Sequence, residues 1–133
     1  MIDGELETGE RAVSADTVAK WGIAVPDGWT VTVRPDRFDA DRTPLDFDPG
    51  TYSAHDYKAF LDKELSFVVM VAEVFEDGAS LAQIEVTGIE WRHGASKTPL
   101  YVGDADVDAL LPEADQQMMV GDAVDSAMRE VGR

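Results

Sequence analysis

The segment "SFVVMVAEVFEDGASLAQIEVTGIEW", residues 66–91, places two long apolar runs on either side of Asp77-Gly78. An Asp-Gly pair in that position is the strongest short sequence signal for a β-hairpin, because both central residues of its turn need a positive φ. The segment therefore predicts two antiparallel strands joined by a two-residue turn. The register that follows has the predicted pairs Phe75–Ser80, Glu73–Ala82, Val71–Ile84, Val69–Val86 and Phe67–Gly88.

This register gives the hairpin one largely apolar face, which includes Val69 and Val71. We expect that face to pack against helices, since antiparallel sheets commonly bury one face and leave the other wet. The opposite face carries Met70 opposite Glu85 and is mixed in character, so it could pair with a second copy of the chain in a homodimer. Gly88 interrupts the alternation, and we expect a β-bulge there.

Two helices and a strand precede the hairpin. Residues 14–22 and residues 53–65 each begin with a serine that can cap a helix, and Asp56 completes a capping box in the second. Between them, "WTVTVR" (residues 29–34) alternates strictly between apolar and polar residues, which predicts a half-buried strand. The predicted order up to the hairpin is therefore helix, strand and helix.

The C-terminal part adds an edge strand and a helix. Residues 111–131 keep apolar residues at helical spacing, and the short run at 99–103 suits the edge of a sheet. The whole pattern predicts an α+β fold, with a three- or four-stranded, mainly antiparallel sheet and helices packed on one face. We expect residues 1–12 to form a frayed acidic N-terminus and residues 13–133 to form a single α+β domain.

The charge of the chain is its strongest compositional signal. Its 133 residues include 27 acids and 11 bases, which gives a formal net charge of −16 and a pI near 4.2. Direct binding to nucleic-acid phosphates needs clustered cations, and a field of this sign repels such a ligand. The charge instead favours a basic protein surface as partner, including that of a nucleic-acid-binding protein. A halophile-type bias of composition would produce the same charge without any function.

Other features exclude several classes of protein. The chain has no cysteine, which excludes disulfides, thiolate nucleophiles and zinc–thiolate sites. Its longest apolar run, "FVVMVA" (residues 67–72), is too short to span a bilayer, and the acidic N-terminus does not resemble a secretory signal. We therefore expect a cytoplasmic protein that does not enter a membrane.

The stretch "DRFDADRTPLDFDPG", residues 36–50, is rich in aspartate and predicts a long charged loop. Its carboxylates and two prolines do not fit the spacing of a calcium loop. The loop is therefore expected to be exposed, either as a surface for a partner or as a solvated connection. The residues expected to contact a partner are Asp36, Asp39, Asp41, Asp46 and Asp48 of this loop, together with Asp104, Asp106 and Asp108.

A second aspartate cluster, "DADVDALLPEAD" (residues 104–115), partly matches a calcium-binding loop. The match fails at the sixth position, where Ala109 replaces the glycine of such loops, and the bidentate glutamate is missing. The alternative is a helix N-terminus with aspartates that the helix dipole favours. The residues that would bind Ca²⁺ are Asp104, Asp106, Asp108 and Asp115.

Little in the sequence points to catalysis. The chain has two histidines, and it lacks the G-x-S-x-G elbow and the glycine patterns of phosphate-binding loops. Glu73 lies in an otherwise apolar strand and could act as a general acid if burial raised its pKa. The more frequent alternative is a carboxylate at the rim of the sheet that reaches water. We therefore expect no enzymatic activity.

Four features of the sequence occur together: "GWTVTVRPD" (28–36), "AFLDKELSFVVMVAEV" (59–74), "GIE" (88–90) and a closing amphipathic helix. In this combination the chain resembles a group of small acidic uncharacterised proteins of actinobacterial phages. It departs from the group at Thr87, where those proteins usually have tryptophan, and at the insertion 92–103. The resemblance implies an accessory phage protein in the host cytoplasm and supplies no catalytic residues.

These observations lead to one hypothesis and its alternatives. The chain is predicted to be a non-enzymatic acidic interaction module, phage-encoded, that binds a basic host or phage protein; a DNA mimic is the sharpest form of this hypothesis. The first alternative is a small calcium-binding domain. The second is a halophile-type acidic domain of unrelated function.

Overall fold

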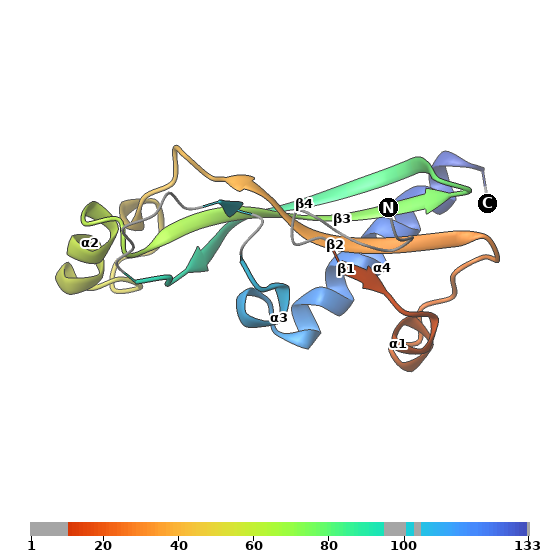
Figure 1. Ribbon diagram of the computed structural model, residues 1–133, viewed down its shortest axis with the longest axis horizontal. Helices are drawn as coiled ribbons and strands as arrows, with labels where there is room; N and C mark the ends of the chain where they lie inside the picture. The colour runs from red at the N-terminus through yellow and green to blue at the C-terminus, as the bar shows by residue number, and fades with distance from the viewer. Residues whose placement is uncertain (1–10, 95–100, 103–104, 133) are drawn as a thin grey trace.

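The computed structural model describes residues 11–94, 101–102 and 105–132. Over these residues the chain forms one antiparallel sheet with strand order β1-β2-β3-β4 and packs helices against it, so the predicted α+β fold is confirmed (Figure 1). The strands are β1 (Arg11–Val13), β2 (Trp29–Phe38), β3 (Ser66–Glu76) and β4 (Ala79–Trp91). The helices are α1 (Ala15–Lys20), the 3-10 turn η1 (Pro44–Asp46), α2 (Ala54–Leu61), α3 (Val107–Leu110) and α4 (Glu113–Glu130).

The helix starts follow from local capping. The Ser14 hydroxyl accepts a hydrogen bond from the backbone N–H of Thr17 at 3.1 Å, which caps α1 as predicted. Ser53 and Asp56 form the predicted capping box of α2. The predicted C-terminal helix begins only after Pro112, because the residues before Leu111 form the separate turn α3.

The hairpin turn is formed as predicted, but the predicted register is wrong beyond it. Asp77 and Gly78 have φ of 49° and 84°, as the two-residue turn requires. The pairing of β3 with β4 then shifts by one residue. Leu81 is the extra residue, because it lies between the pairs Phe75–Ser80 and Val74–Ala82. This β-bulge exchanges the faces of the β4 side chains relative to β3 from Ala82 to Val86, until a second shift at Gly88.

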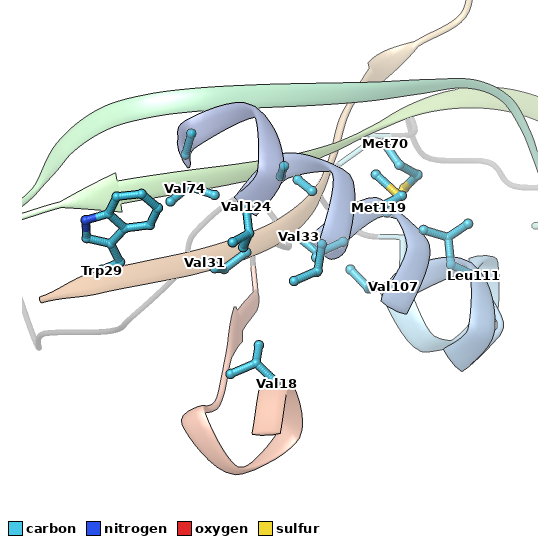
Figure 2. Close-up of a cluster of buried hydrophobic side chains, with 14 of the residues drawn as sticks. Val18, Trp29, Val31, Val33, Met70, Val74, Val107, Leu111, Met119 and Val124 are labelled. Atoms are coloured by element: carbon cyan, nitrogen blue, oxygen red, sulfur yellow. The ribbon is translucent and has the colours of Figure 1, made fainter. Parts of the chain in front are cut away.

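The shifted register reverses the face that packs against the helices. The core lies on the Val68 face of the sheet, not on the Val69 and Val71 face that the sequence predicted, and α1, α3 and α4 cover it (Figure 2). From the sheet it includes Trp29, Val31, Val33, Val68, Met70, Ala72 and Val74, and from α4 it includes Met119, Val120, Ala123, Val124 and Ala127. Burial of each larger apolar side chain contributes about 1.5–3 kcal/mol.

The bulge expected at Gly88 is present. The pairing shifts between Val68–Ile89 and Met70–Val86, and Gly88 has a φ of 70°. A side chain at this position would meet Arg42 and Phe47, each at 3.5 Å from the added Cβ. The bulge therefore provides space for the loop that follows β2.

The loop after β2 and helix α2 form a separate aromatic cluster at one end of the sheet, far from α1 and the end of α4 (Figure 1). Phe67 points away from the Val68 face, because successive side chains of a strand alternate. Its ring lies 5.2 Å from that of Phe47, 5.8 Å from that of Tyr52 and 6.0 Å from that of Phe60. This aspartate-rich loop is thus packed against the sheet through its aromatic residues.

Two predictions concern the edges of the sheet, namely the frayed N-terminus and the edge strand at 99–103. Residues 11 and 12, assigned by the sequence to the frayed N-terminus, pair with β2 as part of β1 and supply the fourth strand. The predicted edge strand at 99–103 lies mostly outside the described residues. The segment 1–10 lies outside them entirely.

Candidate functional site

The predicted partner-binding aspartates of the loop fall into two groups. The carboxylates of the first group bind donors of the same chain. Asp36 forms ion pairs with Arg34 at 3.2 Å and Arg37 at 2.8 Å. Asp39 accepts hydrogen bonds from the backbone N–H of Gly88 at 3.0 Å and from Nε of Arg42 at 3.2 Å. These two carboxylates hold the loop to the sheet, so a partner would have to compete with those internal donors.

The second group is exposed on the loop. Asp41 and Asp48 form no ion pair among the described residues, and Asp46 uses one carboxylate oxygen to accept the backbone N–H of Thr43 at 2.7 Å. Leu45 lies between them and is 75% exposed, which is unusual for a large apolar side chain. Beside it lies a shallow cavity of about 310 Å³, whose lining includes Pro44, Leu45, Tyr52 and Tyr57.

The aspartates of the cluster at residues 104–115 lie around the starts of α3 and α4. Asp104 lies outside the described residues. Asp106 caps α3 by accepting the backbone N–H of Asp108 at 3.1 Å, and Asp108 itself accepts a hydrogen bond from the Gln116 amide at 3.1 Å. Asp115 is exposed in the first turn of α4. Among the described residues, no group of three or more acidic or histidine side chains is arranged to hold a metal ion.

Glu73 lies on the open face of the sheet, the face opposite α4, and is only 6% exposed. Its carboxylate accepts hydrogen bonds from Ser80 at 2.6 Å, from Gln83 at 2.9 Å and from Arg34 at 2.8 Å. Burial acts to raise the pKa of Glu73, but the three donors and the Arg34 charge outweigh it and lower the pKa. Glu73 is therefore an ionised structural group, and neither the general-acid nor the rim interpretation describes it.

Most of the cations whose side chains the structure describes are committed to such internal pairs. Arg34, Arg37 and Arg42 pair with acids on or beside the open face, and Lys20 pairs with Glu113. By contrast, a set of acids forms no ion pair among the described residues; it includes Asp16, Asp27, Asp41, Asp48, Asp77, Asp115, Asp122, Asp125 and Glu130. The negative charge that remains after internal pairing is thus on the surface.

One acidic surface was missed by the sequence analysis. Asp115, Asp122 and Asp125 lie on the outer side of α4, and Met118 is 64% exposed among them. The four positions follow helical spacing on the side opposite Val120 and Val124, so they form one stripe. That spacing was readable in the sequence, where only the apolar side of the helix was considered.

No helix in the described part of the chain is both long enough and apolar enough to cross a membrane. Comparisons with models of protein families, with curated proteins and with solved structures find no match for this chain.

Proposed function

We propose that the chain is a non-enzymatic acidic module that binds a basic protein surface. The observation that carries the proposal is the division of the charges. Arginines on and around the sheet are bound internally, while Asp41 and Asp48 of the loop and Asp115, Asp122 and Asp125 of α4 form no ion pair among the described residues. A surface of this kind attracts lysine and arginine side chains and accelerates association with a basic partner.

A protein partner is favoured over a free ion because the exposed carboxylates are distributed rather than convergent. Along α4, Asp115 and Asp122 are seven residues apart, which corresponds to roughly 10 Å of helix. Each acidic surface also has one exposed apolar side chain, Leu45 on the loop and Met118 on α4. An apolar anchor surrounded by polar groups is typical of protein interfaces.

The sharper form of the proposal is a phage accessory protein that imitates nucleic acid. Support comes from the charge of −16 and from carboxylates placed in a row on a rigid helix. A basic protein that normally binds a phosphate backbone would then be occupied by the carboxylates of this chain, and its release would depend steeply on salt.

The test is a pull-down from an actinobacterial lysate at low salt, followed by elution with a salt step and mass spectrometry. Two variants carry the same change of charge on different surfaces: Asp41→Lys with Asp48→Lys on the loop, and Asp122→Lys with Asp125→Lys on α4. We expect one nucleic-acid-binding protein in the eluate, and we expect one of the two variants to lose it. The unaffected variant is then the control for net charge.

Two results would contradict the proposal. An eluate no richer than that of an unrelated protein of equal net charge would mean that the acidity is compositional. Equal binding by both variants and the parent chain would mean that neither surface is the contact. In the first case, unfolding of the chain at low salt would favour the halophile-type alternative.

A further inference from the structure

The shallow cavity beside Leu45 lies between the loop after β2 and the start of α2, at the end of the sheet far from α1 (Figure 1). Its volume is about 310 Å³, and its lining includes Pro44 and Leu45 of the loop together with Tyr52 and Tyr57. Tyrosine rings offer flat apolar contact area and keep one polar atom at the edge. The walls are therefore mainly aromatic and aliphatic, although the loop itself is acidic.

The two tyrosine rings are held by the aromatic cluster behind them. The ring centroid of Tyr52 lies 5.1 Å from that of Phe47 and 5.8 Å from that of Phe67, both in edge-to-face contact. The ring of Tyr57 lies 6.3 Å from that of Phe60, which also contacts Phe67. The aromatic wall is thus preformed, and a ligand does not have to order it.

The hydroxyl groups of the cavity leave one donor for a ligand. The Ser53 hydroxyl is committed, because it donates to Asp56 at 3.0 Å. Burial and a hydrogen bond to the Glu90 carboxylate raise the pKa of Tyr52 to about 12, so this phenol is engaged as well. The Tyr57 hydroxyl makes no hydrogen bond within the described residues, and it can donate to a carbonyl oxygen. The cavity therefore suits a ligand that is rich in acceptors and poor in donors.

Exposed carboxylates accompany this apolar surface. Asp41, Asp46 and Asp48 lie within four residues of Pro44 in the sequence and form no ion pair among the described residues. Arg42 is the only lysine or arginine between residues 39 and 57, and its guanidinium is bound by the Asp39 carboxylate at 3.2 Å. The charge of the loop therefore attracts a cationic ligand and repels an acidic one.

We propose that this cavity binds an extended, proline-rich segment of a partner protein that carries arginine or lysine next to its prolines. The proline rings pack on Tyr52, Tyr57 and Leu45. A backbone carbonyl of the segment accepts a hydrogen bond from the Tyr57 hydroxyl, and the basic side chain lies among the loop carboxylates. The inference rests on the proposed function, a module that binds basic proteins, and names the segment that the loop recognises.

A proline-rich segment matches the cavity in shape and in hydrogen bonding. It adopts the polyproline II helix, whose carbonyls have no internal partner and can accept from Tyr57. It has few N–H groups, so it buries few donors against a wall that offers few acceptors. It is already extended before binding, and aromatic-lined grooves are the usual sites for such segments. A second copy of this chain fits less well, because each copy carries a net charge of −16.

The experiment is an NMR titration of the intact chain that follows the tyrosine ring signals, with two of them assigned from the Tyr52→Phe and Tyr57→Phe variants. The probes are the capped peptides Pro-Pro-Leu-Pro-Arg, Ala-Ala-Leu-Ala-Arg and Pro-Pro-Leu-Pro-Gln. We expect the first peptide to shift both ring signals saturably. The second keeps the charge without the prolines and the third keeps the prolines without the charge, and we expect each to bind about tenfold more weakly.

Two substitutions test the walls of the cavity. Leu45 is 75% exposed and Leu61 is 61% exposed, so serine at either position should leave the fold intact. Leu45→Ser should weaken binding of the first peptide several-fold, whereas Leu61→Ser lies outside the cavity and should not. Tyr57→Phe keeps the ring and removes the hydroxyl donor, and it should also weaken binding several-fold.

A second pair of variants tests the charge of the loop. Asp41→Asn with Asp48→Asn should weaken binding of the arginine peptide and leave binding of the glutamine peptide unchanged. Asp122→Asn with Asp125→Asn makes the same change of net charge on α4 and should affect the arginine peptide less. Equal effects of the two double variants would mean that the loop carboxylates do not hold the basic residue.

Three other results would overturn the proposal. Equal binding of the proline and alanine peptides would show that the cavity does not select proline. Equal effects of Leu45→Ser and Leu61→Ser would show that the cavity is not the site. A shift of the Tyr57 ring signal on dilution of the protein alone would show that a second copy of the chain occupies the cavity.

The titration and the pull-down fail separately. If the proline peptide leaves both tyrosine rings unchanged while the pull-down still recovers a partner, the cavity is not the site and the proposed function stands. If the peptide binds at the cavity while the pull-down yields no more than its control, the cavity is a peptide site and the proposed function fails.

Discussion

The two faces of β3 are both closed to solvent, but by different means. On one face Ala72 and Val74 are 0% exposed beneath the sheet-covering helix α4. On the other face Val71 is 1% exposed although it pairs with Arg34 and Glu85 across the sheet. Side chains of cross-strand partners lie side by side on one face, so the arginine stems and their ion pairs form the layer above this valine.

Burial of a strand residue therefore does not identify the face that meets the helices. The α4 face depends on the packing of a distant helix, whereas around Val71 the open face is covered by one layer of side chains from neighbouring strands. The first cover is rigid and apolar, and the second is polar and can rearrange. Substitutions on the two faces should therefore differ in their cost to stability.

The largest effect is expected for Val120→Asp. Val120 is 0% exposed in the core on α4, and an unpaired carboxylate there must lose its hydration without gaining a partner. We expect a loss of about 5 kcal/mol or complete unfolding, measured by urea denaturation followed by circular dichroism. Met118→Asp on the exposed side of the same helix is the control and should change stability by less than about 0.5 kcal/mol. Similar values for both variants would mean that α4 does not cover the core.

A smaller loss is expected for Glu73→Ala on the open face. The substitution removes the acceptor of hydrogen bonds from Arg34, Ser80 and Gln83. We expect the free energy of unfolding to fall by about 3 kcal/mol, the cost of breaking a buried ion pair. Glu85→Ala breaks the pair with Arg37 on the same face, where both side chains are about half exposed, and should cost less than about 1 kcal/mol. If the two costs were equal, the Glu73 carboxylate would be effectively solvated.

Valine truncations compare the two covers directly. Val74→Ala creates a cavity beneath α4, and we expect a loss of about 2 kcal/mol in the free energy of unfolding. Val71→Ala creates the same cavity beneath the polar layer, where flexible arginine side chains can settle into the space, so we expect about half that loss. Thermal or urea unfolding of both variants measures the difference. A larger loss for Val71→Ala would show that the polar layer is the more rigid cover.

The smallest effect is expected from pH. The pKa of Glu73 in the folded chain is lowered from its ordinary value of 4.5, so its ionised form stabilises the fold at neutral pH. That contribution is complete above the ordinary pKa and is lost as the pH falls through the lower folded pKa. Glu73→Gln should therefore be less stable than the parent at neutral pH, and the gap should close in acid. A gap that stays constant would mean that the Glu73 charge contributes nothing.

Features set by neighbouring residues could be predicted from the sequence. The Asp77-Gly78 turn and the Ser53–Asp56 capping box were predicted correctly because every atom involved lies within a few residues of its partner. The predicted register was wrong because no local sequence signal indicates the bulge at Leu81. One extra residue is enough to exchange the faces of the strand. In the bulged pairing, Ala82, Ile84 and Val86 of β4 pack against the core that α4 covers.

The candidate site was predicted only in part, because some of its contacts join residues that are distant in the sequence. The sequence predicted exposed aspartates on the loop, and Asp41, Asp46 and Asp48 are exposed. The role of Asp39 could not be read from the sequence, because its donor, the N–H of Gly88, is 49 residues away. The ion pair between Lys20 and Glu113 could not be read from the sequence either, since the two residues are separated by 93 positions.

The position of α4 after the strands has a consequence for synthesis on the ribosome. The sheet strands β2, β3 and β4 leave the ribosome before the helix that covers them. During that interval the run "FVVMVA" at residues 67–72, which has no charge and a high tendency to form β structure, has no cover. The nascent chain carries many aspartates by then, among them the loop at 36–50, and their mutual repulsion would keep neighbouring nascent chains apart. The acidity for which we propose a role in recognition would thus also protect the chain while it is being made.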